Sequence, residues 1–379
     1  MKRMRRAILA GVILAVAFVG LGCGRTSPDR GPIQIGAILP LTGNAAQWGT
    51  PARDGAQLAV DEINAAGGVK GRQVAVTFED DRCEPKDGVS AFNKLLAAQQ
   101  ARVILGAVCS SVTLAVAPLA ERSHVVLISP ASTNPKITAA GDFIFRVIPS
   151  DNLRGEVFAD YLYQDRGLRS VAALYINNEG GVGNRDAFRS RFTQLGGRIE
   201  TEEAYAQDAT DVRSQLTKLK SSSAEALLVV SYPRDTILVM KQARDLDVRK
   251  PLFFQTEAVE DPSVLREAGA AAEGATYILP ASAAGDAPQR FIQAYQKKYN
   301  RKPELFAAEA YDAIRLVVAA LQADQTGSGS PGAVRDFLYK ARNWPGASGT
   351  ITFDQSGDVS KPMAIKQIVK GESQLLIQK

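Results

Sequence analysis

The stretch from residue 102 to residue 135 constrains the fold most, because two short apolar runs flank one segment with helical periodicity. The runs at 103–105 and 125–128 have the length of buried strands, and the apolar residues at 114–119 recur with the period of a helix. A strand, a helix and a second strand in this order predict two neighbouring parallel strands.

Small hydroxyl residues follow both of these strands. Ser110 and Ser111 come after the first, and Ser132 and Thr133 come after the second. Such residues suit the N-cap of a helix, where free backbone N–H groups and the positive end of the helix dipole favour a negative charge. Because the carboxyl ends of parallel strands meet at one edge of a sheet, the sequence predicts a small anion site there.

The same alternation of strands and helices continues along the chain. Apolar strand-like runs are expected at 33–39, 74–78, 143–148, 171–176, 198–205, 226–230, 252–255 and 274–279, and shorter ones at 350–353, 364–369 and 374–377. Helical segments between most of them predict an α/β fold with doubly wound parallel sheets covered on both faces. A chain of 379 residues is long for one domain, so we expect two such lobes, with a first linker at 149–151.

The first 22 residues have the features of an export signal. A basic start, at residues 2–6, precedes an apolar run at 7–21 that is short for a membrane span. The run ends in Gly20-Leu21-Gly22-Cys23, which resembles a bacterial lipobox except that Gly20 stands where leucine is usual. We therefore expect a lipoprotein signal at 1–22, lipidation of Cys23 and a polar tether at 23–32, with Ala15-Val16-Ala17 as an alternative cleavage site for an ordinary signal peptidase.

Charge and cysteine content narrow the class further. The formal net charge of +5 comes almost entirely from the leader, so the rest of the chain gives no reason to expect nucleic-acid binding. Lipidation of Cys23 would leave Cys83 and Cys109, which an oxidising compartment favours joining in a disulfide. The alternative is two unrelated buried thiols. A metal site is not expected, because His124 is distant in sequence from both cysteines.

Five motifs, taken together and in order, carry a resemblance to a known family. They are LPLTGNAAQWG, DEINAAGGVKGR, FEDDRCEPKDG, ILGAVCSSVT and ISPASTNPKIT. The set resembles the leucine/isoleucine/valine-binding proteins of bacterial ABC transporters, densely over residues 33–150 and more weakly to about residue 370. The resemblance implies a type I periplasmic-binding-protein fold, in which two α/β lobes are joined by three hinge segments. The hinges would fall near 148–151, 279–282 and 354–361. Lobe one would be 33–148 plus 282–354, and lobe two 149–281 plus 355–379.

The resemblance also implies a site for a free α-amino acid. Ser110, the main chain at Ala131, and Thr133 match the family's carboxylate-binding positions. The alternative is that the two hydroxyls only cap helices, although one residue can do both. Glu257 matches the glutamate that binds the ligand's ammonium group, and Tyr232 matches the family's tyrosine. The alternative for Glu257 is an ordinary solvated carboxylate in a loop.

The ligand's side chain would meet Trp48 and Phe306, which match positions that line the family's apolar pocket; both could instead be core residues. Gly180 stands where the family often has a tyrosine. The missing ring is expected to open space in lobe two and to admit a larger or differently polar ligand than leucine.

An enzyme is the main rival by class, and the sequence gives it little support. There is one histidine, His124, and no G-x-S-x-G, P-loop or H-E-x-x-H motif. We therefore expect no catalysis and no cofactor. The expected protein is a monomeric lipoprotein on the extracytoplasmic face that delivers its ligand to a permease with separate ATPase subunits. The alternative is the same fold binding an amide, urea or aromatic acid, or acting as a ligand sensor.

Overall fold

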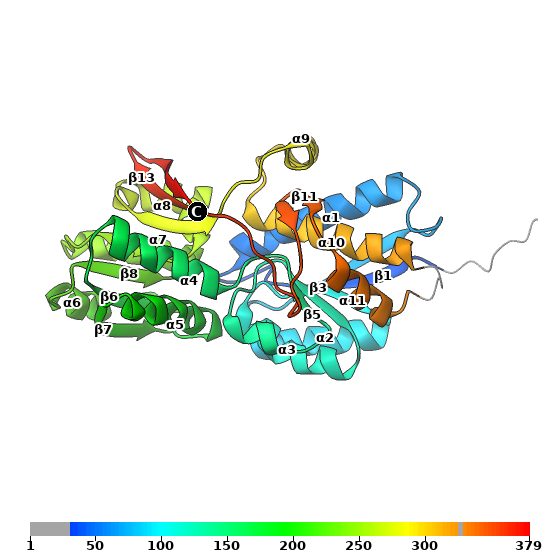
Figure 1. Cartoon of the computed structure of the whole chain (residues 1–379), viewed down its shortest axis with the longest axis horizontal. Helices are drawn as coiled ribbons and strands as arrows, with labels where there is room; N and C mark the ends of the chain where they lie inside the picture. Colours follow the sequence, from blue (N-terminus) through cyan, green and yellow to red (C-terminus); the bar gives the residue numbers. More distant parts are fainter. Residues whose placement is uncertain (1–30, 325–328) are drawn as a thin grey trace, which may run out of the picture.

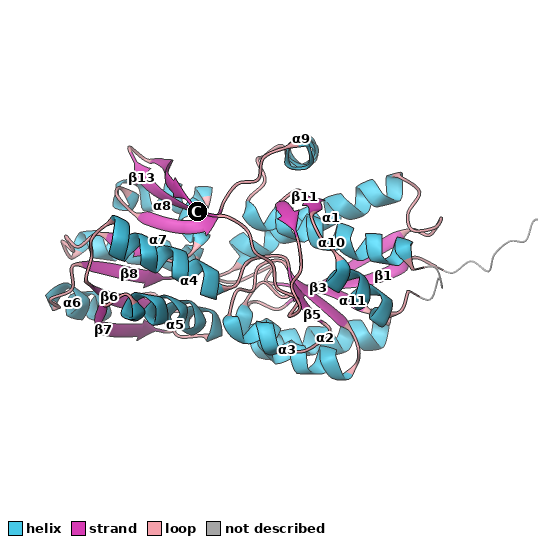
Figure 2. Cartoon of the chain, viewed as in Figure 1, coloured by secondary structure: helices cyan, strands magenta, loops and turns pink. Residues whose placement is uncertain are grey.

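Two separate β-sheets, each accompanied by helices, form the two halves of an elongated molecule. The computed structural model describes residues 31–324 and 329–379. Figure 1 shows the halves side by side, and Figure 2 shows helices on both sides of each sheet. The expected leader, Cys23 and nearly all of the tether lie outside the described residues. Within those residues, no helix is both long and apolar enough to cross a bilayer.

The five strands of the first sheet run parallel in the order β2–β1–β3–β4–β5. The strands are β1 (Ile33–Leu39), β2 (Val74–Asp80), β3 (Val103–Gly106), β4 (Val126–Ser129) and β5 (Ile144–Arg146). The central strands β3 and β4 are buried along their whole length, as expected where helices cover both faces. Helices α1 (Ala46–Ala65), α2 (Pro85–Gln99) and α3 (Ser110–Arg122) follow the first three strands in turn. Three later helices, α9 (Asp286–Tyr299), α10 (Leu305–Ala323) and α11 (Pro331–Lys340), return to this half, where α10 packs along α1.

The second sheet has the order β14–β13–β10–β9–β8–β6–β7. Strands β6 (Ser170–Ile176), β7 (Arg198–Tyr205), β8 (Ala226–Val230), β9 (Leu252–Phe254) and β10 (Thr276–Pro280) run parallel, whereas β13 (Met363–Val369) and β14 (Glu372–Gln378) are added antiparallel. Its helices are α4 (Asp151–Asp160), α5 (Glu179–Gln194), α6 (Arg213–Ser221), α7 (Pro233–Asp245) and α8 (Pro262–Ala268), with the short turns η2 (Tyr161–Asp165), η3 (Glu257–Glu260) and η4 (Gly269–Ala272). A small hairpin, β11 (Trp344–Gly346) and β12 (Gly349–Ile351), precedes the last two strands.

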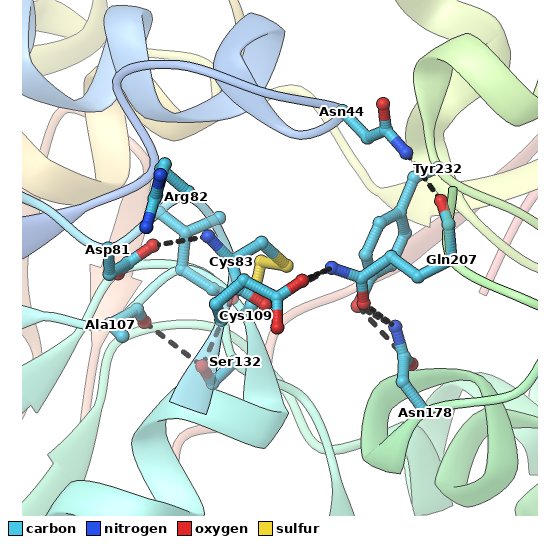
Figure 3. Close-up of a disulfide and its surroundings, with 12 residues drawn as sticks. Asn44, Asp81, Arg82, Cys83, Ala107, Cys109, Ser132, Asn178, Gln207 and Tyr232 are labelled. Carbon is cyan, nitrogen blue, oxygen red and sulfur yellow. Dashed lines mark hydrogen bonds between the residues drawn. A yellow bond between two sulfur atoms is a disulfide. The ribbon is translucent and has the colours of Figure 1, made fainter. Parts of the chain in front are cut away.

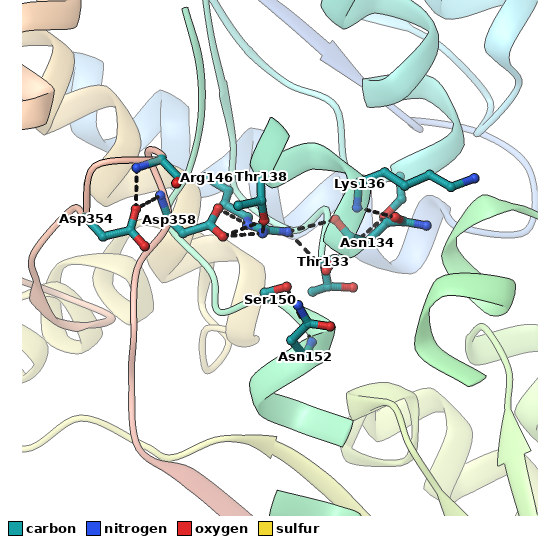
Figure 4. Close-up of polar contacts among 11 residues, drawn as sticks. Thr133, Asn134, Lys136, Thr138, Arg146, Ser150, Asn152, Asp354 and Asp358 are labelled. Atoms are coloured by element: carbon teal, nitrogen blue, oxygen red, sulfur yellow. Dashed lines mark hydrogen bonds and ion pairs between the residues drawn. The ribbon is translucent and has the colours of Figure 1, made fainter. Parts of the chain in front are cut away.

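The chain passes between the halves three times, after β5, after β10 and after β12. Buried ion pairs fix the third passage. The guanidinium of Arg146, at the end of β5, binds the Asp358 carboxylate with 2.6 Å between Nε and Oδ1 (Figure 4). Lys361 lies further along the same passage and pairs with Glu309 of α10. The passages fall near the expected hinge positions, and the division into lobes at the stated boundaries stays a prediction.

Two local expectations near the β3–β4 edge are wrong in detail. The N-cap of α3 is Cys109, so Ser110 and Ser111 are its first two helical residues. After β4 the chain stays irregular up to the 3₁₀ turn η1 (Pro135–Ala139), and Asn134 caps that turn. Pro135 disfavours a helical conformation in the residue before it, so Ser132 and Thr133 cannot begin a second helix.

The structure contains the predicted disulfide between Cys83 and Cys109 (Figure 3). It ties the loop after β2 to the start of α3, with 5.5 Å between the two Cα atoms. Both residues are buried. The bond therefore anchors the β3 edge to the neighbouring loop.

Removing this disulfide should lower stability without changing the fold. In the chain-entropy model the closed loop is worth about 3 kcal/mol. We expect the double variant C83A/C109A to lose about that much free energy of unfolding in urea titrations. The reduced wild-type protein is the matched control and should lose a similar amount. Equal stability of the oxidised and reduced forms would contradict a stabilising disulfide.

Candidate functional site

The carboxyl ends of β3 and β4 lie side by side, because the two strands pair in parallel with Leu105 opposite Ile128. Ser110 is buried in the first turn of α3, and its hydroxyl accepts a hydrogen bond from the Asn134 N–H at 3.2 Å. The hydroxyl proton of Ser110 therefore remains available to a ligand. The Ser111 hydroxyl is buried and has no hydrogen-bond partner among the described residues.

Ser132 turns away from this edge into the interior. Its hydroxyl donates to the Ala107 carbonyl at 3.0 Å and lies 2.7 Å from the Thr113 hydroxyl, and Figure 3 shows the bond to Ala107. Ser129 donates to the same carbonyl at 2.6 Å and accepts from the Ala131 N–H at 3.2 Å. This network holds the two strand ends together. The group that Ala131 leaves available is its carbonyl oxygen, an acceptor.

Thr133 connects the first half of the molecule to the start of α4. Its carbonyl oxygen accepts from the Asp151 N–H at 2.8 Å and from Arg146 Nη1 at 3.0 Å. Figure 4 shows Thr133 between Arg146 and the first turn of α4. Thr133 is thus held at the first passage between the halves.

Three aromatic residues from separate elements form one cluster across the two halves. The Trp48 ring, on α1, lies 4.7 Å from the Tyr232 ring and 5.6 Å from the Phe306 ring, in edge-on geometry in both cases. Tyr232 precedes α7 in the second half, and Phe306 lies in the first turn of α10 in the first half. All three are buried, so the halves are in contact here.

A cavity of about 360 Å³ adjoins this cluster. Trp48 and Phe306 line it from one half, Glu257 lines it from the other, and the passage at 279–283 closes one side. The volume lies within the range of small-molecule sites. Ser110, Ala131, Thr133 and Tyr232 are not part of its lining, so the cavity covers only the apolar and Glu257 end of the predicted site.

The expected free space beside Gly180 is occupied. A Cβ at this position would lie 2.8 Å from the Tyr232 hydroxyl and 3.4 Å from Asn178 Oδ1. Tyr232 and Asn178 also lie within hydrogen-bonding distance, 3.3 Å from Nδ2 to the hydroxyl. The Tyr232 side chain therefore takes the room that the missing ring was expected to leave.

Glu257 follows β9, in the turn η3, and is buried rather than solvated. Its Oε2 lies 2.8 Å from Arg154 Nη1, an ion pair without a well-aligned hydrogen bond. Arg154 is in the first turn of α4, and its Nε lies 4.0 Å from Asp151 Oδ1. Asp151 also accepts from Asn184 Nδ2 at 2.9 Å. Two carboxylates and one guanidinium thus share this end of the site.

Burial raises the pKa of the Asp151 carboxyl to about 6, against the opposing effects of Arg154, the Thr133 hydroxyl and Arg146. Asp151 is completely buried, so loss of water outweighs the nearby positive charges. The carboxyl therefore changes charge within the physiological pH range.

The sequence reasoning missed Arg154 and took Asp151 only for part of a linker. One signal was present. Arg154 lies three residues after Asp151 in the first turn of a helix, where the helix dipole disfavours a cation. A cation in that position implies buried anionic partners, and these come from both Asp151 and the distant Glu257.

The predicted site residues thus fall into two connected groups. Ser110, Ala131 and Thr133 lie at the β3–β4 edge. Trp48, Phe306 and Glu257 line the cavity, and Tyr232 packs against Trp48. Asp151 joins them, because it contacts Thr133 through its backbone and lies beside Arg154, the partner of Glu257.

Comparison with known proteins gives consistent matches along the described chain. A relative from Brucella melitensis, called Leu/Ile/Val-binding protein homolog 3, is 31% identical over 93% of this chain and 95% of its own length. A solved leucine-binding protein from Thermotoga maritima superposes with a TM-score of 0.85 at 27% identity, over 91% of this chain and 98% of that one. A branched-chain amino acid transporter substrate-binding protein from Streptococcus pneumoniae, solved with isoleucine, gives a TM-score of 0.82 at 27% identity, over 92% of this chain and all of that one.

The fold in these neighbours is the type I periplasmic-binding-protein fold, with two α/β lobes. The sequence profile of the family described as periplasmic binding protein matches residues 32–373, which is most of the chain. Members of this family bind solutes outside the cytoplasm and are not enzymes. The chain therefore belongs to the periplasmic binding protein family and is related to its branched-chain amino acid-binding members.

Proposed function

We propose that the protein captures an amino acid, branched-chain or otherwise apolar, between its two lobes and delivers it to an ABC permease. The observation that carries the proposal is the arrangement of the two half-sites. A hydroxyl-rich strand edge lies in one half and a buried carboxylate in the other, an aromatic cluster spans both halves, and Asp151 joins the two. An α-amino acid carries a carboxylate, an ammonium group and a side chain, and each meets a complementary group here.

The ligand's carboxylate would bind at the β3–β4 edge. Ser110 can donate its hydroxyl proton, and the first turn of α3 offers backbone N–H groups at the positive end of the helix dipole. Thr133 lies beside them, and we assign its hydroxyl to the same carboxylate, which requires that its one proton turn from Asp151 to the ligand. The first turn of α3 can therefore begin the helix and bind an anion at the same time.

The ammonium group would bind Glu257 in lobe two. Arg154 contacts Oε2, which leaves Oε1 for the ligand. We also assign the Ala131 carbonyl to the ammonium group. This differs from the carboxylate role expected from the resemblance, because the N–H of Ala131 already donates to the Ser129 hydroxyl. Tyr232 would close over this end of the ligand. The side chain would enter the cavity beside Trp48 and Phe306, where its burial contributes about 25 cal/mol per Å² of apolar surface.

Capture would be coupled to closure of the lobes. In the described conformation the Asn134 side chain of lobe one donates to the Glu179 carbonyl at the start of α5 in lobe two, and Lys136 pairs with Glu179 at 2.9 Å. Gln207 of lobe two reaches the Cys83 carbonyl at 3.2 Å (Figure 3). A ligand that contacts both lobes favours this closed state, and the closed state is what a permease would recognise.

We also propose the placement that the leader implies. Cys23 would carry the lipid and hold the protein, as a monomer, on the extracytoplasmic face. The ATPase subunits would belong to the transporter. The lobe boundaries for this closing motion are those given above, 33–148 plus 282–354 and 149–281 plus 355–379.

Loss of the Glu257 charge should weaken amino-acid binding strongly. Removing one partner of a buried charge pair costs roughly 3–5 kcal/mol, so we expect E257Q to bind leucine at least about a hundredfold more weakly in calorimetry. The control is E267Q, an exposed glutamate on α8 of the same lobe, which should bind normally. Unchanged leucine affinity in E257Q would reject Glu257 as the partner of the ammonium group.

A methyl group at position 183 should hinder closure. A Cβ on Gly183 would overlap Asn134 Nδ2, so the Asn134 amide would have to move away from the Glu179 carbonyl and this contact between the lobes would weaken. We expect G183A to keep its melting temperature without ligand and to bind leucine about tenfold more weakly. G332A, in the first turn of α11 with open space around it, is the control and should match wild type. If G183A binds leucine as tightly as wild type, and leucine reduces its radius of gyration in small-angle scattering as it does in wild type, this contact is not part of closure.

Amino-acid binding should weaken as the pH falls through about 6. Ionised Asp151 attracts an ammonium group, so protonation of its carboxyl, with its raised pKa of about 6, removes that attraction. Arg146, Arg154 and Glu257 are the other charged groups around it. Between pH 7 and pH 5 we expect leucine affinity to fall severalfold, by calorimetry.

The variant D151N isolates this effect. Burial also raises the pKa of three other carboxyl groups to about 7, those of Asp81, Asp235 and Glu309. These groups would still titrate in D151N. The pH dependence should flatten in D151N if Asp151 causes it. If leucine affinity falls with pH as steeply in D151N as in wild type, another group causes the pH dependence.

A further inference from the structure

We propose that Arg154 determines ligand specificity, so that the site also accepts 2-oxo and 2-hydroxy carboxylates carrying the same apolar side chain as the amino acid. Arg154 covers one oxygen of Glu257 and keeps N–H donors that the protein does not use. The inference rests on the proposed function, because it concerns the end of that site assigned to the amino group.

The donors of Arg154 are only partly used. A guanidinium has five N–H donors on three nitrogens. Nη1 faces Glu257 Oε2 at 2.8 Å and donates to the Gln255 carbonyl at 3.3 Å. Within the described part of the chain, Nε is buried and has no hydrogen-bond partner, and Nη2 donates no hydrogen bond. A buried donor without a partner is costly, so Nε indicates a place for an acceptor.

Arg146 is the internal comparison, because it is buried at least as deeply. All three of its nitrogens are bonded: Nε and Nη2 to Asp358, Nη2 also to Thr138, and Nη1 to the carbonyls of Thr133 and Asn134 (Figure 4). That is the pattern of an arginine whose role is structural. Arg154 lies a few residues later in the same chain segment and lacks this pattern.

Acceptors in the same cluster are also without partners. Asp151 Oδ2, Asn184 Oδ1 and Gln255 Oε1 are buried and unbonded in the described part of the chain. The cluster meets the cavity at Glu257, and behind that carboxylate it holds both unused donors and unused acceptors for one small polar group. A 2-oxo oxygen could accept from Arg154, and a 2-hydroxyl could in addition donate to Glu257.

The charges lead to the same conclusion. Asp151 and Glu257 alone would present two negative charges and would demand a cation. With Arg154 the cluster carries one negative charge when Asp151 is ionised and none when it is protonated. An ammonium group suits the cluster with one negative charge, and a neutral oxygen suits the cluster without net charge. Arg154 thus reduces the penalty for a ligand that lacks the ammonium group.

The test compares three ligands that differ only at the second carbon. Leucine carries an ammonium group there, 4-methyl-2-oxopentanoate an oxygen, and 4-methylpentanoate no polar group. By calorimetry, wild type should bind the 2-oxo acid within about tenfold of leucine, and the unsubstituted acid at least about tenfold more weakly than the 2-oxo acid.

Variants then assign the effect to Arg154. In R154Q the affinity for the 2-oxo acid should fall at least about tenfold more than that for leucine. R191Q removes an arginine of the same lobe that pairs with Asp160 away from the cavity, and its ratio of affinities should equal that of wild type. R154K keeps the positive charge but has fewer directed N–H donors. It should lower the affinity for the 2-oxo acid relative to leucine, as R154Q does, but by less. This variant also provides the test if R154Q does not fold.

The outcomes separate this inference from the proposed function. Leucine binding with a 2-oxo acid affinity more than about a hundredfold weaker would overturn the inference and leave the function standing. An unchanged ratio in R154Q and R154K would also overturn it. Binding of the 2-oxo acid without leucine would support the specificity role of Arg154 and reject amino-acid capture. Binding of none of the three ligands would overturn both this inference and the proposed function.

Discussion

The contact between Thr133 and Asp151 determines the geometry of the whole site. Asp151 is the first residue of α4, directly after the chain leaves the first sheet, and its N–H binds the Thr133 carbonyl at 2.8 Å. Its carboxylate binds Asn184 and faces Arg154, which in turn holds Glu257. Since one residue uses both its backbone and its side chain, the proposed carboxylate and ammonium half-sites are linked through Asp151 in this conformation. A small ligand at the proposed site would contact both lobes at once.

Buried charges have two different roles in this molecule. Arg146–Asp358 and Lys361–Glu309 lie where the chain returns to lobe two, and Arg146 is bonded through all of its nitrogens. Buried ion pairs add little net stability, but breaking one leaves an uncompensated charge, so these pairs fix where the chain crosses. Arg154 differs because its donors are incompletely used. The number of satisfied donors thus distinguishes a structural arginine from one available to a ligand.

The sequence is sufficient for the features that depend on local patterns. Alternating apolar runs predicted the two α/β sheets, and cysteine counting predicted the Cys83–Cys109 bond that the structure contains. Contacts made across space could not be predicted in this way. Ser132 turns into the interior because Thr113 and Ala107 receive it there, and the room beside Gly180 is filled by Tyr232 from another loop. Arg154 was missed because Glu257, its partner, lies about a hundred residues away in sequence. The predicted ligand contacts themselves stay predictions.

A crystal structure of the protein with leucine tests the central claim most directly, because it places each polar group of the ligand. We expect the carboxylate at the Ser110 hydroxyl and the first turn of α3, the ammonium group within about 3.2 Å of Glu257, and the side chain beside Trp48 and Phe306. Leucine bound outside the cleft, or bound with its carboxylate toward Arg154 and its ammonium group toward Ser110, would contradict this account.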